Sequence, residues 1–320
     1  MASFFSILSA KSKQCLCFFV IFQGLQGVFA PTQARILLVG PYRTLTTPAQ
    51  AAEIAKDGDR VVIDPGLYRG CAIWRASDLI VEAPPPGAGL TGPVCGGRAL
   101  FYFFGHDILV RGLTFWRARN EAHNGAGILM EGDNLTVEAS RFLDNENGIL
   151  TGGSAASVVR VATSLFSGNG ACDGPCAHAL YAGAAIGRLE VTACLFLDTH
   201  IAHHIKSRAR STVIRGNRME DGATGSASYL IDLPNGGDAT IAGNVMRKGP
   251  RSENKDVAIS IGEGGARNPT HRLDIHGNRF FSDQPEPVWF VRNRTPVPAR
   301  LAGNVLLGRV KALDGPGTSE

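Results

Sequence analysis

The stretch Ile241-Ala-Gly-Asn244-Val-Met246 recurs, with small changes, through most of the chain. Each copy has an aliphatic residue, a small or amide residue three positions later (Leu in the first copy), and a large apolar residue two positions after that. Successive copies start 23 to 34 residues apart. The other seven copies span 110–115, 137–142, 161–166, 191–196, 214–219, 275–280 and 301–306. A unit this small cannot bury its apolar face alone, so the repeat predicts units that stack on their neighbours.

The residues around each copy predict short strands. Apolar and polar residues alternate with a period of two, and loops rich in Gly, Asn, Asp and Ser separate the segments. Parallel stacking would place equivalent side chains about 4.8 Å apart, so amides at one position could bond along a ladder. The ladder predicted in this way consists of Asn217, Asn244, Asn278 and Asn304, with Ser140, Ser164 and Cys194 in the same position earlier.

With this repeat, the chain resembles the right-handed parallel β-helix proteins of the pectin-lyase-like superfamily. The entry segment supports the resemblance, because residues 35–40, 46–56 and 57–68 look like that family's first strand, capping helix and first turn. The resemblance implies an all-β fold, a single-stranded right-handed parallel β-helix of about eight to ten turns with an N-terminal capping helix. We expect this domain to span residues 35–308 and a flexible tail to span 309–320.

The composition agrees with a folded, turn-rich chain. Of the 320 residues, 44% are hydrophobic, which excludes general disorder, and the 39 glycines show no collagen period. The formal net charge of +4 is too small for a chain of this length to indicate a nucleic-acid partner. We expect one domain, present as a monomer.

Residues 1–34 have the layout of a secretory signal peptide. Lys11 and Lys13 precede a short apolar stretch that ends in small residues. Cleavage after Ala30 or after Ala34 fits this layout, and Pro31 favours the cut after Ala34. An uncleaved membrane anchor is the alternative, although the apolar run is short for a span of about 20 residues. We therefore expect a secreted or periplasmic protein with no membrane contact after cleavage.

Export would permit disulfide bonds. Cys172 and Cys176 bracket a short loop, and Cys71 and Cys95 form a second candidate pair, but the sequence settles neither pairing. Cys194 occupies a ladder position and is expected to be structural. A zinc site at the short loop would need two further ligands, and none is suitably spaced.

Polar residues gather in the segment around residue 204 and in the turns before and after it. If Ile205 points inward, His204 and Lys206 point outward from the same strand. The densest polar cluster of the chain comprises His178, Tyr181, His203, His204, Lys206, Arg208, Tyr229 and Asp232.

This cluster is similar to the catalytic region of chondroitinase B and the related alginate lyases, which place a Lys on one turn and an Arg on a neighbouring turn. The resemblance implies uronate lyase or epimerase chemistry on a polysaccharide. Lys206 would be the base or would neutralise the sugar carboxylate, while His204 would carry a proton. The next turn has Asp232 as an orienting partner and no Arg, so the pattern departs from those enzymes, and Arg208 or His204 would have to substitute.

Other interpretations of the cluster stay open. Tyr181, Tyr229, Asn235 and Glu263 would bind substrate in the enzyme and would bind glycan in a non-catalytic or structural cell-surface protein. A hydrolase would need paired carboxylates, such as Asp232 with Glu263 or with Asp221. A structural interpretation makes Lys206 and Asp232 a surface ion pair. We predict no metal site and no cofactor; calcium is left open without a motif that supports it.

Overall fold

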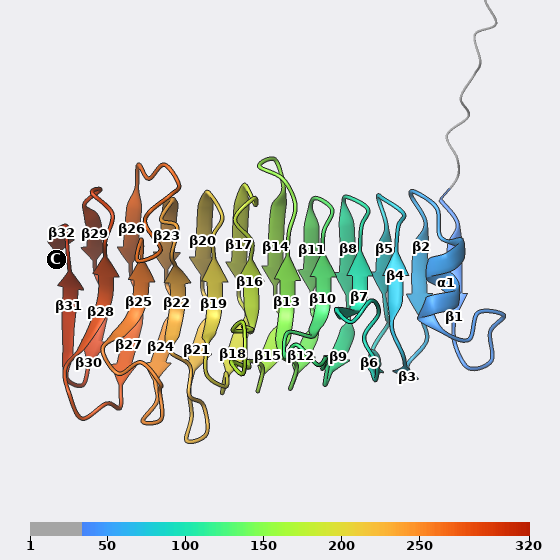
Figure 1. Cartoon of the computed structure of the whole chain (residues 1–320), viewed down its shortest axis with the longest axis horizontal. Helices are drawn as coiled ribbons and strands as arrows, with labels where there is room; N and C mark the ends of the chain where they lie inside the picture. Colours follow the sequence, from blue (N-terminus) through green and yellow to red (C-terminus); the bar gives the residue numbers. More distant parts are fainter. Residues whose placement is uncertain (1–33) are drawn as a thin grey trace, which may run out of the picture. The chain divides into compact units, whose positions relative to one another are not determined.

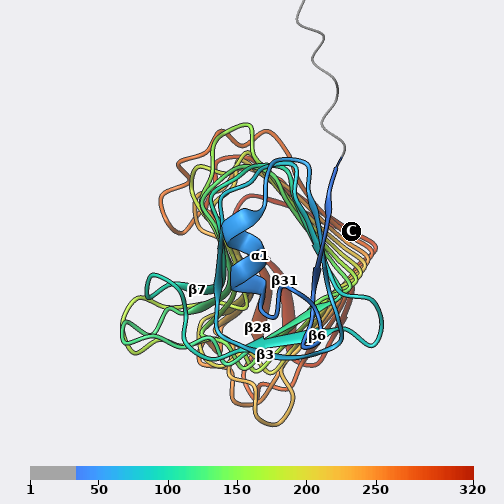
Figure 2. The same ribbon diagram turned by 90° about the vertical axis from the view of Figure 1, so that its right-hand side faces the viewer.

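The computed structural model describes residues 34–320 and shows a parallel β-solenoid of about 11 coils. Figure 1 shows the coils side by side along one axis, and Figure 2 looks down that axis. This confirms the predicted all-β parallel β-helix, with slightly more coils than expected. The expected signal peptide lies outside the described residues except for Ala34. Among residues 34–320, no helix is long and apolar enough to cross a membrane.

Three parallel sheets form the walls of the solenoid, and each coil contributes a strand to each wall. We call them sheets A, B and C. Sheet A contains, in spatial order, β1 (Ile36–Val39), β2 (Arg60–Ile63), β5 (Ile80–Glu82), β8 (Ile108–Arg111), β11 (Leu135–Glu138), β14 (Val158–Ala162), β17 (Arg188–Thr192), β20 (Ser211–Arg215), β23 (Asp238–Ala242), β26 (Leu273–His276), β29 (Ala299–Ala302) and β32 (Gly317–Ser319).

The other two walls have ten strands each. Sheet B contains β3 (Gly66–Arg69), β6 (Ala88–Thr91), β9 (Leu113–Trp116), β12 (Arg141–Leu143), β15 (Leu165–Ser167), β18 (Leu195–Leu197), β21 (Arg218–Glu220), β24 (Val245–Lys248), β27 (Arg279–Ser282) and β30 (Val305–Leu307). Sheet C contains β4 (Ala72–Trp74), β7 (Ala99–Phe103), β10 (Ala126–Met130), β13 (Asn147–Thr151), β16 (Leu180–Ala182), β19 (His203–Ser207), β22 (Tyr229–Leu233), β25 (Val257–Ile261), β28 (Val288–Asn293) and β31 (Val310–Asp314).

The large apolar residue of each repeat points into the solenoid. Four phenylalanines from successive strands of sheet B stack face to face, with ring centroids 5.1, 4.7 and 4.5 Å apart, and the same register continues through later strands. The buried members of this column are Phe115, Phe142, Phe166, Phe196, Met219, Met246 and Phe280, and partly buried Leu306 ends it. The repeat identified in the sequence therefore forms the core that holds the coils in register.

The predicted Asn ladder lies at the turn from sheet A to sheet B. Asn217 Nδ2 donates to Asn244 Oδ1 at 3.0 Å, and Asn244 Nδ2 donates to Asn278 Oδ1 at 2.9 Å. Asn278 continues the series to Asn304 at 2.9 Å. These bonds confirm the alignment of the four amides. Buried Cys194 occupies the same position at the start of this series, and its backbone N–H donates to Asn217 Oδ1 at 2.8 Å.

A left-handed backbone residue precedes each ladder residue. Gly243 has φ of 64°, and Ala139 and Ala193 adopt φ of 46° and 52° at the equivalent place. A Cβ added to Gly243 would meet no atom within 4 Å. Alanine therefore has room at this turn, as at Ala139 and Ala193, although its left-handed backbone is strained. The glycine of the later repeats thus serves the conformation of the turn rather than its packing.

The helix near the start of the described chain agrees with the sequence prediction, whereas the C-terminal tail does not. Helix α1 (Pro48–Ile54) lies within the predicted helical segment, begins with a capping box of Thr47 and Gln50, and lies inside the outline of the coils in Figure 2. Its role as an end cap stays a prediction. The tail differs from the expected flexible segment, because β31 pairs with β28 and β32 pairs with β29. The open edges of those two strands offer the tail backbone partners that a sequence pattern does not reveal.

Two disulfides are present, Cys71–Cys95 and Cys172–Cys176, and Cys194 is free and buried. Both candidate pairings from the sequence are therefore formed in the structure. Burial raises the pKa of the Cys194 thiol to about 11, which suits a structural rather than a reactive cysteine.

Candidate functional site

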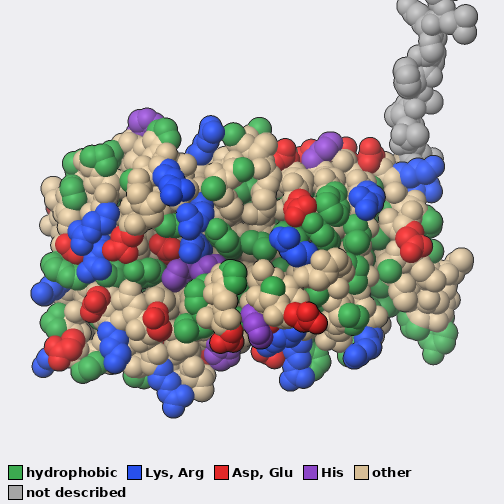
Figure 3. Space-filling model, viewed as in Figure 1, with side chains coloured by type: hydrophobic (Ala, Val, Ile, Leu, Met, Phe, Trp, Pro, Cys, Tyr) green, Lys and Arg blue, Asp and Glu red, His purple; other side chains and the backbone are tan. Residues whose placement is uncertain are grey.

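Most residues of the predicted polar cluster lie on sheet C, near the middle of the solenoid, and Lys206, Asp232 and His203 lie on its outer face. Tyr181, Lys206, Asp232 and Ser260 are register partners on the successive strands β16, β19, β22 and β25. Figure 3 shows histidine side chains beside lysine or arginine side chains on this face. Parallel pairing without a shift therefore brings together residues that are 25 to 28 positions apart in the chain.

Lys206, Asp232 and His203 form the centre of the site. The Lys206 Nζ lies 3.7 Å from Asp232 Oδ2, and the His203 Nε2 lies 3.3 Å from the same oxygen. The Lys206 side chain is only 17% exposed. Burial lowers the pKa of Lys206, an effect that the Asp232 charge opposes. The lysine is thus partly shielded from water and points to the outer face, where an extended ligand could reach it.

A column of aromatic rings runs beside this centre. The ring centroids of His178 and His203 are 4.7 Å apart, and those of His203 and Tyr229 are 5.1 Å apart. His178 is buried, and this burial, followed by the positive charges of His203, Lys206 and Arg208, holds the pKa of His178 well below its usual range. His178 therefore stays neutral and supports the rings that follow it.

Arg208 lies at the edge of the site directly after β19. Its Nε donates to the Tyr181 hydroxyl at 3.0 Å, and its Nη1 donates to Asn235 Oδ1 at 2.8 Å. The Lys206 Nζ lies 5.7 Å from the centroid of the Tyr181 ring. These contacts hold a second cation beside Lys206, as the sequence prediction required of Arg208 if it replaces the missing arginine of the next turn.

Glu263 connects the site to a hollow in the surface. The Tyr229 hydroxyl and the Ser260 hydroxyl donate to Glu263 Oε2 at 2.9 and 3.1 Å. Burial, and then Glu263, raise the pKa of Tyr229, so this phenol stays protonated. Arg292 Nη1 lies 3.5 Å from Glu263 Oε1. A cavity of about 560 Å³ adjoins this group and is lined by Ser228, Tyr229, Glu253, Asn254, Lys255, Asp256 and Arg292.

The sequence analysis missed Arg292 because it lies 60 residues from Asp232 in the chain. The structure places Arg292 in the same column of sheet C, since Asp232 pairs with Ser260 and Ser260 pairs with Arg292. The alternation of apolar and polar residues in Val288–Asn293 indicates a strand. It does not show that this strand places Arg292 in the same column as Lys206. The arginine that is absent one turn after Lys206 thus has a counterpart three turns after it.

The prediction that His204 points outward is wrong. His204 is fully buried, its Nδ1 lies 2.6 Å from the Thr199 hydroxyl, and its Nε2 lies 3.2 Å from buried Asp221. The outward histidine is His203. The strands of sheet C break the alternation with two successive buried residues, as at Leu230 and Ile231 in the next coil. His204 and Ile205 occupy these two positions, so the period of two fails at this point.

This correction also separates the predicted carboxylate pairs. Asp221 lies inside the solenoid with His204, so it cannot pair with Asp232 on the outer face. Asp232 and Glu263 both remain on sheet C, and each already has a cationic neighbour in Lys206 and Arg292. The donor set does not suit calcium, which takes six to eight oxygen ligands, because positive side chains face both carboxylates.

Among residues 34–320, one group of side chains has the spacing of a metal site: Asp78, His106 and Asp107, with ligand atoms within 4.8 Å of one another. All three residues are exposed and lie in turns that lead into sheet A, away from the cluster on sheet C. His106 Nδ1 is within 2.8 Å of Asp107 Oδ2, which raises the pKa of His106. The contact between His106 and Asp107 explains why these two exposed side chains lie close together.

No family model matches the chain, and no curated protein matches it. Several solved structures are similar over most of its length. An alginate lyase from Paenibacillus sp. str. FPU-7 is 19% identical with a TM-score of 0.57, and the match covers 87% of this chain and 99% of the lyase. The pectate lyase Pel9A is 15% identical with a TM-score of 0.54, covering 87% and 78%. The product of ORF18 of Geobacillus virus E2 is 12% identical with a TM-score of 0.53, covering 82% and 54%.

At these identities the similarity concerns the fold. The lyases among these neighbours are right-handed parallel β-helices, and this chain has the parallel sheets and stacked coils of that fold. We conclude that this protein has a right-handed parallel β-helix fold.

Proposed function

We propose that this protein acts outside the cytoplasm, as a monomer, on an acidic polysaccharide that lies along sheet C. The supporting observation is the partly buried Lys206, which faces outward between Tyr181 and Asp232 and whose pKa is lowered by burial. The likeness to an alginate lyase and a pectate lyase supports a polysaccharide ligand, since those proteins share the fold. Export rests on the sequence of residues 1–34 alone.

The chemistry we propose is β-elimination from a uronate residue. Lys206 Nζ takes the proton from C5, a double bond forms between C4 and C5, and the bond from C4 to the glycosidic oxygen breaks. Arg208 neutralises the sugar carboxylate, which makes the C5 proton more acidic. His203, rather than His204, donates a proton to the departing oxygen, and Asp232 orients both His203 and Lys206. An epimerase would return a proton to C5 instead of releasing the oxygen.

Incubation with a panel of uronic-acid polymers tests this proposal. We expect an increase in the absorbance of the unsaturated product, and Lys206→Ala should reduce the rate by at least about a hundredfold, the usual lower range for a general base. Lys311→Ala is the matched control, because Lys311 also faces outward on sheet C but packs against Trp289 at the far end. Exchange of deuterium into C5 without an absorbance change would identify the epimerase.

The pH dependence follows from the state of Lys206. A lysine acts as a base only when it is neutral, so the elimination rate should rise with pH as Lys206 loses its proton. Because burial lowers the pKa of Lys206 below its ordinary value of 10.5, the rise should begin at lower pH than for an exposed lysine. A pH profile without any rising limb would contradict the role of Lys206 as base, whereas a falling limb is expected where the proton donor His203 is lost.

A non-catalytic glycan-binding protein is the second candidate. The observation that favours it is the contact of Lys206 with Asp232, because an adjacent carboxylate stabilises the protonated lysine. Binding to a uronate polymer, with neither product absorbance nor deuterium exchange across the panel, would support this candidate over the enzyme.

A further inference from the structure

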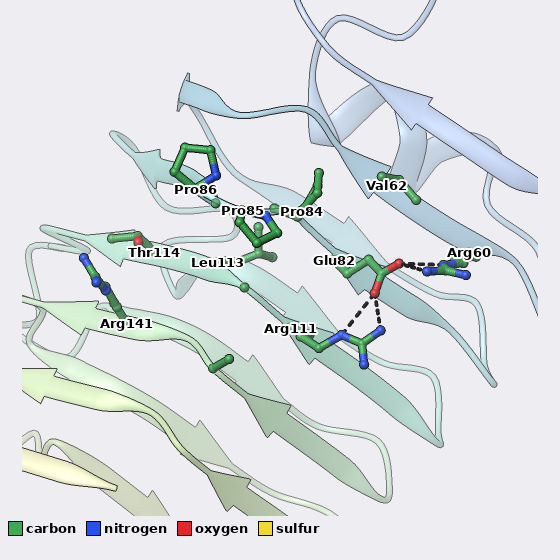
Figure 4. Close-up of a pocket in the computed structure, with 14 residues that line it drawn as sticks. Arg60, Val62, Glu82, Pro84, Pro85, Pro86, Arg111, Leu113, Thr114 and Arg141 are labelled. Atoms are coloured by element: carbon green, nitrogen blue, oxygen red, sulfur yellow. Dashed lines mark hydrogen bonds and ion pairs between the residues drawn. The ribbon is translucent and has the colours of Figure 1, made fainter.

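A second cavity lies far from sheet C, at the corner where sheet A turns into sheet B in the early coils. Its volume is about 550 Å³, which is within the range of small-molecule sites. Figure 4 shows the residues that line it, which come from strands β2, β5, β8, β9 and β12 and from the connection after β5. The cluster around Lys206 contributes no residue to this cavity.

An unusually long connection builds one wall of the cavity. Residues 83–87 link β5 to β6, whereas Gly112 alone links β8 to β9 in the next coil. Gly87 lies directly on this shorter turn, because a Cβ at Gly87 would be 2.8 Å from the Gly112 carbonyl oxygen. In Figure 4 the rings of Pro85 and Pro86 stand beside Leu113 and Thr114. The proline loop thus forms a firm apolar wall above a row of short turns.

The opposite side of the cavity is positively charged. The lining contains three arginines, Arg60, Arg111 and Arg141, and a single carboxylate, Glu82. Arg60 Nε donates to Glu82 Oε1 at 2.6 Å, and Arg111 Nε donates to Glu82 Oε2 at 3.1 Å. Glu138, which does not line the cavity, lies 4.0 Å from Arg111. Arg141 is exposed and has no hydrogen bond or ion pair with the described residues, so positive charge remains uncompensated.

We propose that this cavity binds a hexuronate residue of an acidic polysaccharide. The sugar carboxylate binds Arg141, the lining arginine that has no partner among the described residues, and the C–H face of the ring packs on the prolines and Leu113. A pyranose ring combines one apolar face with polar substituents, which matches a lining that has both prolines and arginines. The choice of an acidic sugar among carboxylate ligands rests on the function proposed for sheet C.

This cavity is a second binding site for the polymer. Sheet C and the corner between sheets A and B face different directions around the solenoid (Figure 2), so the two sites bind separate stretches of chain or separate chains. The second site has no exposed lysine or histidine in its lining and therefore binds without cleaving. Its effect is to keep the enzyme on an insoluble or concentrated substrate.

Calorimetric titration with a trigalacturonate tests the proposal. The Lys206→Ala protein serves as the background, so that no substrate is consumed. Adding Arg141→Ala should weaken one class of binding site at least about tenfold, the loss expected for a charge-assisted hydrogen bond. Arg279→Ala is the matched control, since Arg279 has the equivalent outward place on sheet B five coils later and lies outside the proline loop.

Each outcome decides the proposal. Loss of binding with Arg141→Ala, no loss with Arg279→Ala, and no binding of the neutral galactose trisaccharide support it. Equal affinity of both trisaccharides, or an unchanged titration after Arg141→Ala, overturns it. Displacement by inorganic phosphate at the same affinity as the trisaccharide overturns the assignment to a sugar. An inactive protein that keeps Arg141-dependent binding would refute the lyase chemistry while leaving this site in place.

Discussion

Lys248 is a lysine whose whole side chain is buried inside the solenoid. Its Nζ donates to the Ser228 carbonyl oxygen at 2.6 Å, and it lies at the end of β24, where sheet B turns toward sheet C. Burial lowers the pKa of Lys248 to about 8, and the charge of Asp221 opposes this shift only in part. The same corner holds His204 and Thr199, so polar groups replace the apolar core at this place.

This lysine makes stability depend on pH in a predictable direction. The folded-state pKa of about 8 lies below the ordinary lysine value of 10.5, so the unfolded chain binds more protons between these values and stability rises as pH rises through this window. Lys248→Met should remove this rise. The difference in unfolding free energy between wild type and variant should change by roughly 3 kcal/mol between pH 7 and pH 10.5, as measured by urea denaturation. A difference that stays constant across this range would contradict the buried state of Lys248.

A second amide pair was not foreseen from the sequence. Asn145 Nδ2 donates to Asn169 Oδ1 at 3.0 Å, at the corner between sheets B and C. These two residues belong to only two coils, so no repeat long enough to be recognised reveals them. The long ladder at the other corner was predictable because the same amide recurs at one position in four copies.

At the scale of structural elements, the turn from sheet A to sheet B depends on its amides. Asn244 is fully buried, donates to the Ile214 carbonyl oxygen at 3.0 Å, and accepts from the Asn217 backbone N–H at 2.9 Å. Asn244→Ala leaves these backbone groups without partners and without water. We expect the free energy of unfolding to fall by about 3 kcal/mol, because each unsatisfied buried group costs about 1–3 kcal/mol.

Asn304→Ala is the control for this prediction. Asn304 is the last amide of the ladder and only half-buried, so water can replace its contacts with Asn278 and the Ile275 carbonyl oxygen. Its loss should be clearly smaller when both variants are compared by chemical denaturation. Equal losses at the two positions would show that the ladder contributes nothing through burial.

Strand β19 shows where a period of two stops being reliable. Alternation predicted that His204 and Lys206 share one face, but His204 and Ile205 are both buried and the outward positions are His203 and Lys206. Two successive buried residues recur at the same register position in the next coil, at Leu230 and Ile231. The residues of a single strand do not reveal this departure from alternation.

At the scale of the whole molecule, β31 and β32 are the terminal strands of sheets C and A at the C-terminal end of the solenoid. β31 pairs with β28, whose Val288, Phe290 and Val291 are buried, and β32 pairs with β29. Removing residues 309–320 makes β28 and β29 the terminal strands, so that the apolar side chains of β28 lie at an open edge that can pair with another molecule. We expect the truncated protein to associate in a concentration-dependent way in size-exclusion chromatography with light scattering.

The full chain should elute as one monomeric species over the same concentrations, and removal of Glu320 alone should change nothing. A truncated protein that stays monomeric and equally stable would show that the tail does not protect this end.

The sequence by itself determined the stacking of coils, the Asn ladder, the apolar column and the set of polar residues near one another, because each depends on a side chain repeated at a constant place in successive turns. Only the tertiary structure decided that His203 and not His204 faces outward, that Arg292 joins the column of Lys206, and that a proline loop meets three arginines at another corner. These features depend on where the backbone bends and on which coils are neighbours, and such long-range geometry is set by packing between coils rather than by any local pattern.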